Sequence, residues 1–155
     1  MPVIYREAKA YLESWIENFL DKPHPAFGGY SPCPYAKKSL IDAKVEFIAC
    51  NAHTFPDKIN IKGYDVIVYI FEDEMSAEEL TKKAEVFNTQ NPSLVALEDH
   101  PQEQEAVKDC VLNNGRYATI FIQDRQKLEK FRKNLKKTCY YENWSAEYLD
   151  EVINR

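Results

Sequence analysis

The sequence predicts an α+β fold, a ferredoxin-like plait with a permuted strand order, whose four strands form an antiparallel sheet. Segments 64–71 and 117–122 are almost continuously apolar, as expected of strands that are covered on both faces. After the first helices, the elements follow the order strand, strand, helix, strand, helix, strand, helix. Moving the outer fourth strand of the plait to the N-terminal side makes it segment 45–50 and places the two most apolar strands at the centre.

The chain of 155 residues is predicted to be one α+β domain with three parts. The first part, residues 3–43, is mainly helical: apolar residues recur at helical spacing over 3–20, and a short helix follows at 35–43. The stretch between these helices is rich in proline and glycine and reads as a loop. The second part, residues 44–138, contains the sheet, and a C-terminal helix is expected at 145–154.

Within the sheet-containing part, three helices are predicted between and after the strands. Ser76 and Glu79 form a capping box for a helix that ends near residue 89, before a strand at 93–98. A second helix is expected over 102–113, as an insertion between two paired strands, because apolar residues recur after Pro101. Asp124 caps a third, basic helix.

The apolar central strands leave one face of the predicted sheet in need of cover. If both plait helices lie on one face, the opposite face must also be shielded from water. The N-terminal helix and the last helix are candidates for this cover, and a homodimer is the other.

Composition narrows the location and the partners. The net charge of −5 argues against binding to nucleic acid, which usually needs a basic face. No apolar run approaches the roughly 20 residues of a membrane helix, and residues 1–7 lack the basic-then-apolar order of a signal peptide. The four cysteines are far apart in the sequence, which indicates free thiols. We therefore expect a cytoplasmic protein with a small molecule or another protein as its partner.

Cys33 is the residue whose surroundings indicate chemistry. It stands between Pro32 and Pro34, and proline suits the first position of a helix, so Cys33 is expected at the helix cap. There the thiol would face unpaired backbone N–H groups and the positive end of the helix dipole. Lys37 and Lys38, about one turn further on, would lower its pKa further, which favours a reactive thiolate. The opposing interpretation is a small buried side chain with a structural role.

The motif Cys33-Pro34-Tyr35-Ala36 resembles the active-site motif of monothiol glutaredoxins, and it is similar to the corresponding motif of omega-class glutathione transferases. The resemblance is local and extends over residues 33–50. It implies a mixed disulfide between Cys33 and glutathione, and it makes a thioredoxin-like fold the alternative to the plait.

Two functions follow from these observations. The first is a thiol-dependent enzyme or redox protein, in which Cys33 is the nucleophile, Lys37 lowers its pKa, and His100 or His24 donates a proton. The second is a non-catalytic module that binds a small ligand or a protein through a sheet face or the aromatic segment 139–144. We predict no metal site, because the sequence lacks paired ligands at metal-binding spacing.

Overall fold

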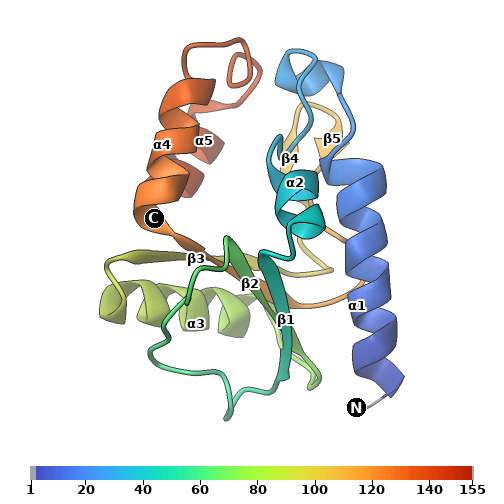
Figure 1. Cartoon of the computed structure of the whole chain (residues 1–155), viewed down its shortest axis with the longest axis vertical. Coiled ribbons are helices and arrows are strands. Elements are labelled where there is room, and N and C mark those ends of the chain that lie inside the picture. Colours follow the sequence, from blue (N-terminus) through green and yellow to red (C-terminus); the bar gives the residue numbers. More distant parts are fainter. Residues whose placement is uncertain (1–2, 155) are drawn as a thin grey trace.

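The computed structural model describes residues 3–154, without the side chains of residues 3, 4 and 37. A four-stranded sheet in the order β1-β2-β6-β3 crosses the molecule (Figure 1). Its strands are β1 (Val45–Cys50), β2 (Val66–Phe71), β3 (Leu94–Asp99) and β6 (Thr119–Asp124). The α+β class and the plait order with its outer strand moved forward are confirmed, and the two most apolar strands are the central pair β2 and β6.

The predicted antiparallel sheet is wrong at one edge. β6 runs antiparallel to β2 and to β3, but β1 pairs parallel with β2, with Val45 opposite Val66 and Cys50 opposite Phe71. Two parallel strands need a crossover of about a dozen residues or more to bring the chain back to the same end of the sheet. The non-helical stretch 51–65 provides that crossover (Figure 1).

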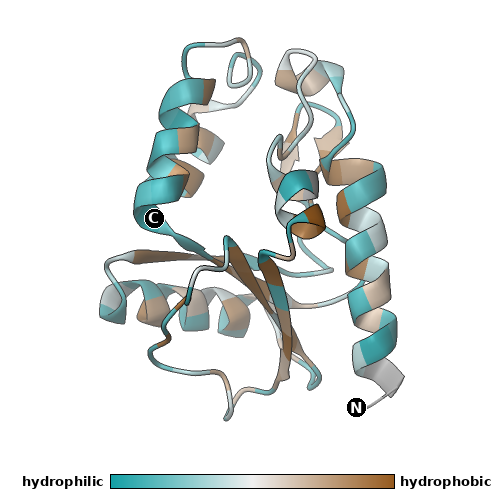
Figure 2. Ribbon diagram, viewed as in Figure 1, coloured by the Kyte–Doolittle hydropathy of each residue, from teal (hydrophilic) through white to brown (hydrophobic). Residues whose placement is uncertain are grey.

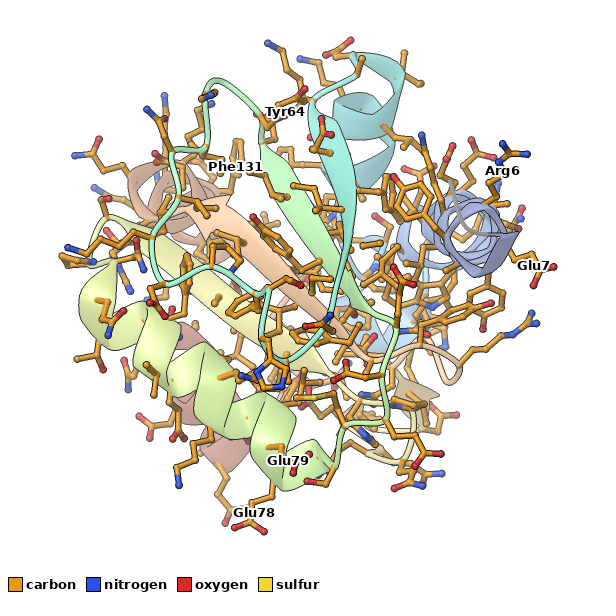
Figure 3. All side chains as sticks on the ribbon, turned by 90° about the horizontal axis from the view of Figure 1, so that it is seen from below. Arg6, Glu7, Tyr64, Glu78, Glu79 and Phe131 are labelled. Carbon is orange, nitrogen blue, oxygen red and sulfur yellow. The ribbon has the colours of Figure 1, made fainter. Side chains whose placement is uncertain are left out.

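One face of the sheet is closed by α3 (Ala77–Gln90). The capping box between Ser76 and Glu79 begins this helix as predicted. Leu80, Ala84 and Phe87 are fully buried against alternate residues of the central strands. Glu78 and Glu79 point away from the sheet on the outer side of the helix (Figure 3). The result is a continuous dry layer between α3 and the sheet.

Helices α1 (Val3–Trp15) and α4 (Arg125–Leu135) lie over the opposite face. Leu12 of α1 packs on Val68 and Ile70, so the N-terminal helix covers this face as one of the predicted candidates. The expectation that both plait helices share one face is wrong, because α4 stands above the face opposite α3 (Figure 1). The apolar stripe of α4 packs against Tyr35 and an aromatic cluster instead of lying flat on the strands.

The remaining helices are short and frame the upper part of the molecule. α1 continues directly into a π-helical turn, η1 (Ile16–Leu20). A 3-10 turn, η2 (Pro25–Phe27), follows, and then α2 (Ala36–Ile41). The C-terminal helix α5 is Ala146–Ile153, within the predicted segment, and lies beside α4 (Figure 1).

The helix predicted over 102–113 is wrong, because this segment forms a small hairpin. Its strands are β4 (Ala106–Val107) and β5 (Cys110–Val111), joined by a tight turn in which Lys108 has a φ of 55°. Val107 lies opposite Cys110, and both side chains are buried. Two adjacent apolar residues on each side of a two-residue turn resemble a helical stripe in sequence, which explains the error.

A third group of buried residues lies beyond the sheet. Phe27, Leu135 and Tyr140 form its centre, together with Val107 and Cys110 of the hairpin. Gly28 has a φ of 64°, and a Cβ atom placed on it would lie 2.5 Å from the sulfur of Cys139. The loop before α2 and the loop after α4 are therefore in direct contact here.

Side chains form hydrogen bonds with main-chain groups at both outer edges of the sheet. Along β3, Asn88 of α3 accepts from the Ala96 N–H at 2.7 Å and donates to its carbonyl at 3.0 Å. Arg125 donates to the Leu94 carbonyl at 3.2 Å on the same strand. At the other edge, the Tyr5 hydroxyl donates to the Phe47 carbonyl at 2.6 Å.

Hydropathy follows the layers. The strands are mainly hydrophobic along their length, whereas the helices alternate between hydrophilic and hydrophobic positions (Figure 2). Within residues 3–154, no helix combines the length and the apolar character needed to cross a membrane.

Candidate functional site

A cavity of about 290 Å³ lies on the sheet face opposite α3. Val66, Val68 and Phe121 of the central strands line its floor. Residues of η1 and α2 line one wall, and residues of α4 line the other. Its volume is close to the lower end of the roughly 300–1,000 Å³ that is typical of small-molecule sites.

Aromatic side chains dominate the walls of this cavity: Trp15, Tyr35, Phe131, Tyr140, Tyr141 and Trp144. The rings of Tyr35 and Phe131 are stacked, with their centroids 4.1 Å apart, so they connect α2 to α4. Trp144 stacks on Tyr148 of α5 at 5.1 Å. The first contact joins the two walls, and the second joins the segment after α4 to α5.

Cys33 lies in the wall of the cavity, on a loop that the backbone holds firmly. Its N–H donates to the Leu20 carbonyl at 2.9 Å, and the Tyr140 hydroxyl donates to the neighbouring Pro32 carbonyl. The π-helical turn η1, in which the Asp21 N–H donates to the Ile16 carbonyl, ends at Leu20. The irregular end of the first helix therefore fixes the position of the cysteine.

The environment of Cys33 differs from the expected helix cap. Helix α2 begins at Ala36, and its N-cap is Tyr35, so Cys33 lies outside the helix. Burial raises the pKa of the Cys33 thiol, and the negative charge of Asp21 adds to this. Backbone N–H groups of Tyr35 and Ala36 act in the opposite direction, but their effect is smaller than that of burial. The predicted shift of this pKa toward neutrality is therefore wrong in direction.

Lys37 and Lys38 were expected to lower the pKa of Cys33, and the structure does not support this. The Lys37 side chain lies outside the part that the structure describes. Lys38 is highly exposed and faces Asp42, with its Nζ atom 3.8 Å from a carboxylate oxygen. Lys38 thus points its charge along α2 and into solvent.

Neither of the predicted proton donors, His100 and His24, lines the cavity that contains Cys33. His100 is buried, and its Nε2 lies 2.6 Å from the Met75 carbonyl oxygen, while its Nδ1 accepts from the Gln102 N–H at 3.1 Å. Its ring therefore carries the proton on Nε2, and both nitrogens are engaged. It lines a separate, more polar pocket beside α5. The Nδ1 of His24 accepts from the Ala26 N–H at 3.0 Å.

Asp99 is the last residue of β3, and protein donors bond to its carboxylate. Its buried carboxylate accepts from the Asn113 side chain at 2.8 Å and from the Asn114 side chain at 2.6 Å. Burial raises its pKa, and the hydrogen bonds from the two asparagines partly oppose this. Across residues 3–154, no group of three or more histidine, cysteine, aspartate or glutamate side chains is arranged to hold a metal ion.

Two charged residues of the cavity were not predicted as site residues. Burial, together with the charges of Glu98, Glu151 and Asp99, raises the pKa of Glu105 to about 7. The second is Arg132, which belongs to the helix described above only as basic. The sequence does contain a signal for it, because Leu128, Phe131, Arg132 and Leu135 have the spacing of one apolar helix face.

No protein-family model, curated protein or solved structure matches the chain. The functional argument therefore depends on the geometry of the cavity.

Proposed function

We propose that the protein binds a small, mainly apolar molecule in the cavity between the sheet and α4. The observation that carries this proposal is the cavity itself: it is built from the central strands and from facing aromatic residues on two separate walls. Small-molecule sites are typically concave and mainly apolar, with a few polar groups in their lining. This space has that combination, which supports a binding function.

A neutral fluorescent probe tests this proposal. N-phenyl-1-naphthylamine should gain fluorescence when it enters an apolar cavity. Val66→Trp, which places a larger side chain in the cavity floor, should abolish most of that gain. Val86→Trp is the matched control, because Val86 is 48% exposed on α3, at the closed face. Equal fluorescence with both variants would reject the cavity as the binding site.

A second candidate function is thiol exchange at Cys33. The observation that favours it is that backbone N–H groups of Tyr35 and Ala36 act on the thiol, as donors would on a thiolate. With glutathione disulfide, the Cys33 thiolate would attack one sulfur, form a mixed disulfide and release one glutathione thiolate. The Cys33 proton goes to solvent, and no further oxidant is needed. The raised pKa opposes this reaction, so we rank it below simple binding.

Alkylation separates the two candidates. Iodoacetamide should modify Cys33 more slowly than Cys139 up to about pH 9, because the thiolate is the reacting form and burial raises the pKa of Cys33. Peptide mass spectrometry measures both rates in one sample. Faster modification of Cys33 below about pH 7 would instead support the thiol enzyme and make glutathione disulfide the first substrate to test.

The proposed site fits a reducing compartment. All four cysteines are unpaired thiols, and two of them, Cys50 and Cys110, are buried. Disulfides are rare in the cytosol, where thiols are kept reduced. A cytoplasmic location with a small-molecule partner is therefore part of this proposal.

A further inference from the structure

Arg132 is a half-buried basic residue in the lining of the cavity. It lies in the α4 wall, and Tyr140 and Tyr141 belong to the same lining. Its Nη2 donates to the Val152 carbonyl at 3.3 Å. Among the described residues, no carboxylate lies within ion-pair distance of its guanidinium. A guanidinium carries five N–H donors, so most of this group's capacity is unused.

Lys127, the other basic residue that lines the cavity, differs from Arg132 because it has a carboxylate partner. The Nζ atom of Lys127 lies 3.5 Å from a carboxylate oxygen of Asp65, and its side chain is half exposed. Lys127 thus has a protein partner and access to water. Arg132 has neither a carboxylate partner nor full hydration, and a buried charge is costly without a counterion.

The carboxylates that line the cavity bond to groups other than Arg132: Asp65, Glu98, Asp99, Glu105 and Asp124. Glu105 interacts with the charges of Glu98, Glu151 and Asp99, whereas Arg132 interacts with those of Arg125 and Glu129 on its own helix. The two sets have no member in common. Among the described residues, none of the carboxylates that line the cavity is therefore paired with Arg132.

A further unpaired donor belongs to the same lining. The indole N–H of Trp144 is buried and has no hydrogen-bond acceptor among the described residues. The polar groups of the lining that lack a protein acceptor, in Arg132 and Trp144, are thus donors. A ligand that suits them carries acceptors.

We infer that the ligand of the cavity is an amphipathic carboxylate, whose carboxylate group pairs with Arg132 while its apolar body lies on the strands between the aromatic walls. This inference rests on the proposed binding function and names its ligand class. The planar fork of an arginine matches the two oxygens of a carboxylate, and such charge-assisted pairs are stronger than neutral hydrogen bonds.

Three probes with the same eight-carbon chain test the inference: octanoate, 1-octanol and octylamine. Trp15 and Trp144 are the two tryptophans of the chain and both line the cavity, so their fluorescence reports binding directly. At pH 8, octanoate should bind about tenfold more tightly than 1-octanol, as one charge-assisted pair would provide. Equal affinities, or tighter binding of octylamine, would overturn the inference.

Variants of α4 locate the effect. Arg132→Gln should reduce the preference for octanoate over 1-octanol to about onefold and leave 1-octanol binding unchanged. Lys133→Gln removes the same charge from an exposed neighbour and should keep the preference. Arg132→Lys keeps the charge without the planar fork and should give an intermediate value. A preference that survives Arg132→Gln would overturn the assignment to this residue.

These measurements distinguish the two proposals. If N-phenyl-1-naphthylamine and 1-octanol bind but octanoate has no advantage, the cavity binds ligands and the carboxylate inference is wrong. If none of the probes binds, both proposals fail.

Discussion

The two faces of the sheet use the same strands in different ways. Alternate residues of β2 point to opposite sides: Ile67, Tyr69 and Phe71 meet α3, whereas Val68 and Ile70 meet α1. The α3 face is closed by a helix that lies along it, while the other face is covered by α1 on one side and left with a cavity beneath α4. An apolar strand therefore indicates that both of its faces are covered by other elements. It does not indicate that side chains fill the space on both faces.

The largest expected difference between the two faces is in the free energy of unfolding that is lost when a leucine on the covering helix is shortened to alanine. Leu80 of α3 is fully buried, whereas Leu128 of α4 lines the cavity. Leu80→Ala should lower the free energy of unfolding by about 3–4 kcal/mol, because it opens a new void. Leu128→Ala should cost about 1 kcal/mol, because it enlarges a space that already exists. Urea unfolding measures both, and equal losses would contradict the contrast between the faces.

The second prediction concerns the loops above the open face. Gly28→Ala should lower the free energy of unfolding by about 2–3 kcal/mol, because the new Cβ atom meets Cys139 and the φ of 64° is strained for alanine. Gly29 has a φ of 88° with nothing within 4 Å of a Cβ atom. Gly29→Ala is the matched control and should cost about 1 kcal/mol. Similar losses would mean that the contact between the two loops contributes little.

A third prediction concerns pH, because Glu105 lines the cavity and is partly buried there. The pKa of Glu105 is raised from 4.5 to about 7 in the folded chain. The folded state therefore favours the protonated form, and this contribution to stability is present below pH 4.5 and lost as the pH rises through 7.

Glu105→Gln should remove the loss of stability that accompanies the ionisation of Glu105. The variant should be more stable than the parent by about 1 kcal/mol at pH 8, a value reduced for the partial exposure of the group, and equal to it near pH 4.5. Urea unfolding at the two pH values measures the difference. Glu103→Gln changes an exposed carboxyl of the same segment and should shift neither value. A stabilisation that is the same at both pH values would rule out titration of Glu105 as its cause.

The smallest expected effect concerns the support of the Cys33 loop. Tyr140→Phe removes the hydrogen bond to the Pro32 carbonyl and should lower the free energy of unfolding by about 1 kcal/mol. Tyr141→Phe is the control in the neighbouring position. If the bond positions Cys33, the Tyr140→Phe variant should also alkylate faster at Cys33 in the iodoacetamide assay. An unchanged rate would show that the other backbone bonds suffice.

The sequence predicted most of the fold and less of the site, and particular residues show why. Apolar runs and caps such as the Ser76–Glu79 box are local signals, so the strand order and α3 could be predicted. The direction of β1 depends on how the stretch 51–65 crosses the sheet, which no local pattern encodes. The hairpin at 106–111 has the same apolar spacing as a helix, and only its turn at Lys108 distinguishes the two.

The site was harder to predict because its properties come from distant contacts. Cys33 was predicted as a reactive thiol at a helix cap, but burial raises its pKa, and the loop that holds it bonds to Tyr140, more than a hundred residues later. Arg132 has the spacing of the apolar face of its helix, but only the structure shows that this face lines a cavity. Local sequence therefore identified the thiol but could not give its ionisation.

The side chains that bond to the outer strands have a consequence for assembly. An exposed strand edge is a template on which another chain can add a strand. Asn88 and Arg125 occupy main-chain groups of β3, and Tyr5 occupies one on β1. A second copy that extended this sheet would first have to displace those bonds, so growth of the sheet from chain to chain is disfavoured at both ends, which helps the protein to resist aggregation.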